Sequence, residues 1–164
     1  MRRTTAASTT GHVPPATRAL RAALAAEQAA IYGYGVVGSH LAGTARALAT
    51  TDWTAHQVAA DQLTALLQGR GATPGPAAVA YQLPHAVSTA AQALRLAAVL
   101  EDQVTSAYLS LVALDEQSVR MLGARQVRAS ALRAAAWRGR TVAFPGLSAS
   151  VLASRSSGRQ REGG

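Results

Sequence analysis

Apolar residues recur every three or four positions between Leu20 and Leu41, a pattern typical of an amphipathic helix in a bundle. Glu27 interrupts this apolar stripe at a position that would face the core. Because a buried carboxylate without a partner is costly, the chain must give it a hydrogen-bond donor, a proton or a metal. The pattern predicts a helix that begins at Thr17 as the N-cap and ends near Ala42.

The same stripe occurs a second time, around Glu101. When Glu27 is laid on Glu101, Tyr34 falls on Tyr108 and the flanking apolar positions coincide. Each of the two helices therefore carries a Glu in its core stripe and a Tyr two turns later. This repeat indicates a bundle built from two similar helix pairs. The second copy predicts a helix from Ser88, as the N-cap, to Leu114.

Between these helices the sequence allows a first turn at Gly43-Thr44 or at residues 49–52. The early turn gives two helices of equal length, so we expect the second helix to span residues 44–70. It would place His56 within about a turn of the height of Glu27. The residues expected on its inward face are Leu48, Asp52, Ala55, His56, Ala59, Leu63, Leu66 and Leu67.

Residues 71–87 contain three prolines and are long enough, when extended, to cross a bundle from end to end. Such a crossover would make the second and third helices parallel. A fourth helix is expected over residues 118–138. Its predicted inward residues are Leu122, Gln126, Ala129, Arg133 and Ala136.

Composition favours one all-α domain, because 49% of the residues are hydrophobic and only 4% are aromatic. We expect a disordered arm over residues 1–16, a four-helix bundle over 17–147 and a disordered basic tail over 148–164. The absence of Cys excludes thiolate metal sites and Cys nucleophiles. No secretory signal or membrane-spanning stretch is apparent, so we expect a cytoplasmic protein with no membrane contact.

Three segments of the chain resemble an actinobacterial ferritin-like family of unknown function. They are residues 26–35, 70–74 and 143–147. The paired Glu positions and the crossover agree with this resemblance. It implies a ferritin-like four-helix bundle, whose metal-bearing members use four carboxylates and two histidines. This chain departs from that pattern. Trp53 stands at the Glu position three residues before His56, and in the fourth helix Val127 and Ser130 stand at the equivalent Glu and His positions. The resemblance therefore implies a degenerate metal centre.

Two interpretations of the core residues stay open. The first is a buried polar network without a cofactor, composed of Glu27, Tyr34, Asp52, His56, Glu101, Tyr108 and Arg133. In it Arg133, predicted within a turn of the height of Glu101, would take the place of a cation, and its removal would cost about 3 to 5 kcal/mol. The second is a single Fe or Mn ion held by Glu27, His56 and Glu101.

These interpretations lead to different functions. A network without metal predicts a binding or structural module, with a homodimer as the expected assembly, whereas a metal predicts a metal-binding or redox protein. A third alternative is an Arg-rich nucleic-acid-associated protein, because the net charge is +8 and every basic residue is Arg. Several of those arginines lie in the tails, which makes nucleic acid the weaker expectation. No nucleophile with a base and no phosphate-binding loop is present, so enzymatic activity stays undecided.

Overall fold

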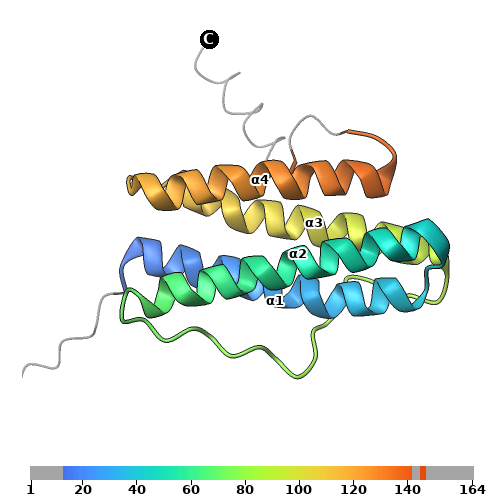
Figure 1. Ribbon diagram of the computed structural model, residues 1–164, viewed down its shortest axis with the longest axis horizontal. Helices are drawn as coiled ribbons and strands as arrows, with labels where there is room; N and C mark the ends of the chain where they lie inside the picture. Colours follow the sequence, from blue (N-terminus) through green and yellow to red (C-terminus); the bar gives the residue numbers. More distant parts are fainter. Residues whose placement is uncertain (1–12, 142–144, 147–164) are drawn as a thin grey trace, which may run out of the picture.

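The computed structural model describes residues 13–141 and 145–146. Within them the chain forms four helices and no strand: α1 (Pro15–Ser39), α2 (Gly43–Gln68), α3 (Ala90–Val112) and α4 (Gln117–Arg138), as Figure 1 shows. The all-α four-helix prediction is confirmed. The predicted basic tail and most of the predicted N-terminal arm lie outside the described residues.

The long crossover is also confirmed. After α2 the chain between Gln68 and Ala90 runs back along the whole bundle, so that α2 and α3 point in the same direction (Figure 1). Side chains of α1 hold this segment in place. Arg21 Nε donates to the Thr73 carbonyl at 3.2 Å, and Gln28 Nε2 donates to the Gly75 carbonyl at 3.2 Å. The crossover is therefore a strap bound to the outer side of α1.

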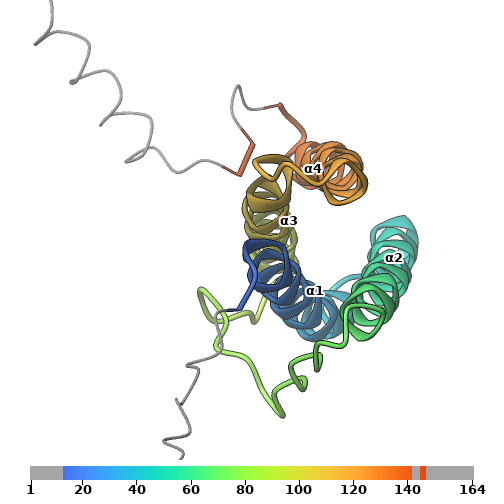
Figure 2. The same cartoon turned by 90° about the vertical axis from the view of Figure 1, so that its left-hand side faces the viewer.

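The four helices pack in the order α4, α3, α1, α2. The closely packed pairs are α3 with α4, α1 with α2 and α1 with α3. Seen end on, the helices follow an arc with α2 and α4 at its two ends (Figure 2). Among the described helices, α2 and α4 do not form a comparable packed pair, so side chains must close the core between them.

Three predicted helix boundaries differ from the structure. α1 begins at Pro15, which pre-sets the helical φ, and Thr17 is buried in the first turn instead of acting as the N-cap. α2 begins at Gly43, whose φ is 56°, one residue before the predicted start of the second helix. The N-cap of α3 is Thr89, not Ser88, because Thr89 forms a reciprocal capping box with Gln92. The early turn between α1 and α2 is nevertheless confirmed.

Some predicted inward positions are also wrong. Leu48 and Ala55 on α2 and Ala136 on α4 are exposed. The buried residues of α4 are Val119, Leu122, Gly123, Ser130, Ala134 and Trp137. A shift of one residue turns a side chain by about 100° around the helix, which is enough to exchange Ala136 for Trp137.

Close helix packing depends on two glycines. A Cβ on Gly123 would lie 2.8 Å from the Leu111 Cβ, so glycine lets α4 approach the end of α3. A Cβ on Gly33 would lie 2.5 Å from the Leu100 Cδ1, which means that α1 accepts this leucine from α3.

None of the four helices is long and apolar enough to cross a bilayer, a finding that holds for the described residues.

Candidate functional site: a buried ion cluster

Glu27, His56 and Glu101 meet in the centre of the bundle, and all three side chains are completely buried. The imidazole of His56 lies between the two carboxylates. Its Nδ1 is 2.6 Å from Glu27 Oε2, and its Nε2 is 3.0 Å from Glu101 Oε1. Helices α1, α2 and α3 each contribute one residue to this contact.

The position of His56 favours its charged form. Burial opposes the charge, but the hydrogen bonds to Glu101 and Glu27 outweigh burial and raise the pKa of His56 to about 9. An ionised carboxylate can only accept a hydrogen bond, so two carboxylate partners require a donor on each ring nitrogen. The geometry and the pKa both indicate an imidazolium at neutral pH.

Glu101 is the most densely hydrogen-bonded carboxylate of the cluster. Besides His56, its Oε1 accepts from Tyr34 Oη at 2.7 Å and from Arg133 Nε at 2.8 Å. Burial alone would raise the pKa of Glu101, but the bonds and charges of His56 and Arg133 lower it below its ordinary value. Arg133 forms an ion pair with Glu101, and its side chain is 19% exposed against 0% for Glu101.

A second set of contacts links α4 to α2 across the open end of the arc. The indole Nε1 of Trp137 donates to Asp52 Oδ2 at 2.9 Å and to Tyr34 Oη at 2.8 Å. Burial, followed by the charge of Glu101, raises the pKa of Asp52. Asp52 thus accepts from Trp137, and the Tyr34 hydroxyl, which donates to Glu101, lies 3.4 Å from the same Asp52 oxygen. Trp137 and Arg133 together close the core where α2 and α4 do not pack.

Trp137 is the cluster residue that the sequence analysis missed. It lies four residues after Arg133, so both side chains project from the same face of α4. The spacing was available in the sequence, but the inward face was assigned to Ala136. The sequence signal that would have identified it is a Trp one helical turn after Arg133, because a buried indole N–H needs an acceptor such as a core carboxylate.

Glu27 and Tyr108 are less well satisfied. Among the described residues, Tyr108 Oη, Glu27 Oε1 and Glu101 Oε2 are buried atoms without a hydrogen-bond partner. Burial and the nearby charge of Glu27 raise the pKa of Tyr108, which keeps it a neutral phenol. The structure thus brings the Tyr108 hydroxyl close to Glu27, but without a hydrogen bond of ordinary geometry among the described residues.

The donor set does not fit a metal ion. Both His56 nitrogens point at carboxylate oxygens, and an imidazolium has no lone pair to offer a metal. Arg133 already supplies a cation at Glu101, so the charges of His56 and Arg133 balance those of Glu27 and Glu101. Within the described part of the chain, no group of three or more His, Asp or Glu side chains has metal-binding geometry.

The remaining histidines are separate from this cluster. His40 and His85 are partly buried and bond to backbone carbonyls of Val36 and Gln92. His12 lies outside the described residues. Asp61 is exposed on α2.

Comparisons with known proteins agree on a family and give no activity. The model of a domain of unknown function, DUF4439, matches residues 19–149. A crystal structure of a conserved hypothetical protein, rv2844, from Mycobacterium tuberculosis is similar, with 32% identity and a TM-score of 0.74 over 78% of this chain and 98% of that chain. No curated protein matches. The chain therefore belongs to the DUF4439 family, a domain of unknown function.

Proposed function

We propose that this protein is a ferritin-like bundle in which two protein cations, His56 and Arg133, take the place of the metal, and that it serves as a binding or structural module. The observation that carries the proposal is the imidazole bridge from Glu27 to Glu101 at 2.6 and 3.0 Å. Support for the ferritin-like assignment comes from the single long crossover between parallel helices α2 and α3.

Charge balance supports permanent ion pairs of His56 and Arg133 with the two glutamates, in preference to a metal site. Two buried carboxylates facing each other without cations would repel, and one would take up a proton. The bond of Arg133 to Glu101 at 2.8 Å removes this need, because a guanidinium stays charged at every physiological pH. A divalent ion would have to displace His56 or Arg133 from its carboxylate before it could bind.

The direct test is the protonation state of His56. Long-range proton–nitrogen NMR spectra of the metal-free protein should give imidazolium signals for His56 at pH 7, with ring shifts that stay unchanged until the pH approaches 9. His40 and His85 serve as internal references, because their ring nitrogens contact backbone carbonyls and no carboxylate.

Metal loading supplies the opposing outcome. The proposal predicts that protein purified without chelators, then exposed to Fe(II) or Mn(II) without oxygen, retains no stoichiometric metal after desalting. A one-to-one metal content that disappears in Glu27→Gln would contradict it and support the single-metal alternative. The homodimer and the cytoplasmic location stay predictions, and light scattering tests the first.

A further inference from the structure

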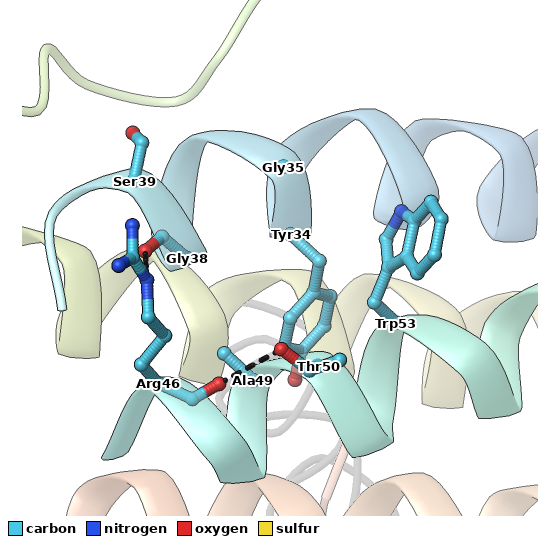
Figure 3. Close-up of a pocket in the computed structure, with 8 residues that line it drawn as sticks. All are labelled: Tyr34, Gly35, Gly38, Ser39, Arg46, Ala49, Thr50 and Trp53. Atoms are coloured by element: carbon cyan, nitrogen blue, oxygen red, sulfur yellow. Dashed lines mark hydrogen bonds between the residues drawn. The ribbon is translucent and has the colours of Figure 1, made fainter. Parts of the chain in front are cut away.

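A pocket lies on the surface between α1 and α2, apart from the buried ion cluster. It has a volume of about 390 Å³. Figure 3 shows Arg46 at one end and Trp53 at the other, both on α2, with Gly35 and Gly38 of α1 along the opposite wall. The Tyr34 ring descends from α1 into the space between the two helices.

The two glycines of this wall have no structural explanation in packing or backbone. A Cβ on Gly35 or Gly38 would meet no atom within 4 Å, and neither has a positive φ. Gly33 differs, because a Cβ there would collide with Leu100. Glycine inside a helix is unfavourable by about 1 kcal/mol relative to alanine. Because Gly35 and Gly38 have no side chains, the α1 wall of the pocket is smooth and the space beside it stays open.

The pocket carries one sign of charge. Arg46 is the charged residue of its lining, and no acidic side chain lines the pocket. The Nε of Arg46 donates to the Gly38 carbonyl at 3.0 Å, which fixes the guanidinium at the rim. Its terminal nitrogens have no ion-pair partner among the described residues. A guanidinium held in this way is suited to a carboxylate.

The rest of the lining suits a flat ring. Arg46 and Trp53 are seven residues apart on α2, a rise of about 10 Å along the helix axis. Between them Ala49 and Thr50 are small, so the floor does not fill the space between cation and indole. The partly exposed indole of Trp53 provides the apolar contact that an aromatic ring prefers, and the buried Tyr34 lies beneath it at the pocket wall.

From these features we infer that the pocket binds a small aromatic carboxylate, with the carboxylate on Arg46 and the ring between the glycine wall and Trp53. The site lies outside the ion cluster and does not depend on the protonation of His56. Tyr34 connects the two places, because its hydroxyl bonds to Glu101 and its ring lines the pocket.

The test uses benzoate as the ligand and benzamide as its neutral analogue. Proton–nitrogen NMR spectra of the full chain should shift at Gly35, Gly38 and the Trp53 indole on addition of benzoate, with a Kd on the order of 1 mM. Benzamide should bind at least about tenfold more weakly, because it carries no negative charge to form an ion pair with the Arg46 guanidinium. The indole of Trp137 is the internal reference and should shift less.

Two variants separate the site from a general effect. Arg46→Gln should weaken benzoate at least about tenfold and weaken benzamide much less, whereas Arg125→Gln, at an exposed position of α4, should leave both unchanged. Gly35→Leu with Gly38→Leu should abolish binding of both ligands while the melting temperature stays equal or rises, since leucine is the better helix former.

Three results would overturn the inference. These are no shift at saturating benzoate, equal binding of benzoate and benzamide with no effect of Arg46→Gln, and shifts that map to another surface. If the double leucine variant does not fold, Arg46→Gln alone still decides the question. None of these results alters the NMR test of His56, so the pocket and the ion cluster can fail separately.

Discussion

The two carboxylates of the core occupy equivalent positions in the sequence repeat but have different surroundings. Glu101 accepts three hydrogen bonds on one oxygen, from His56, Tyr34 and Arg133. Glu27 accepts one hydrogen bond, from His56, and its other oxygen has no partner in the described part of the chain. The tyrosines differ in the same way, since Tyr34 is fully bonded and Tyr108 is not.

The difference follows from the packing order of the helices. α4 packs on α3 and therefore brings Arg133 and Trp137 to the Glu101 side of the cluster. Glu27 lies on α1, whose packed neighbours are α2 and α3, and of these α2 contributes His56. A repeat in sequence thus duplicates side chains without duplicating their neighbours.

The largest effect is expected from removing His56, which bonds to both Glu27 and Glu101. His56→Leu leaves Glu27 without a described donor and removes a cation from Glu101, and breaking such a buried pair costs about 3 to 5 kcal/mol. The melting temperature should fall by about 10 °C or more. The matched control is His85→Leu on the crossover, which should change stability little. A His56→Leu protein that melts with the wild type would show that the bridge does not stabilise the fold.

The pH dependence of stability isolates the same bridge without mutation. The folded-state pKa of His56 is raised from 6.5 to about 9, so its stabilising contribution is complete below pH 6.5 and is lost as the pH rises through 9. Unfolding measured by calorimetry across this range should show an alkaline decline, which His56→Leu lacks. An identical decline in both proteins would assign it to other groups.

A smaller effect on stability is expected for Arg133, which bonds to Glu101 and not to Glu27. Arg133→Met should cost about 1.5 to 3 kcal/mol, because Glu101 keeps His56 and Tyr34 as donors. This is less than the sequence predicted for a fully buried guanidinium. Arg125→Met, an exposed residue on the same helix, should stay within about 0.5 kcal/mol of wild type. Equal unfolding energies for the two variants would refute a special role of Arg133.

The tyrosine pair gives the finest comparison. Tyr34→Phe removes a donor from Glu101 and an acceptor from Trp137, so we expect a loss of about 1.5 to 3 kcal/mol. Tyr108→Phe removes a hydroxyl without a described partner and should change stability by less than about 0.5 kcal/mol. Urea unfolding of both variants measures the contrast. A comparable loss for Tyr108→Phe would mean that its hydroxyl is bonded, with a buried water against Glu27 as the simplest partner.

The sequence by itself determined the four helices, the early turn at Gly43, the long crossover and the burial of Glu27, His56 and Glu101. Each of these depends on local information. Apolar periodicity identifies a helix and its inner stripe, prolines and glycines mark its ends, and a charged residue inside the stripe identifies a polar core.

Apart from the pairing of Arg133 with Glu101, which the sequence predicted, tertiary structure decided which cluster residues bond to one another. Periodicity fixes the inward face to within about one residue, and that uncertainty is the difference between exposed Ala136 and buried Trp137. It also gives no information on how the helices are arranged around the core. The arc with α2 and α4 at its ends (Figure 2) is what places Arg133 and Trp137 at Glu101 and Asp52, and leaves Glu27 with one donor. Hydrogen bonds need alignment within fractions of an ångström, which only the packed helices supply.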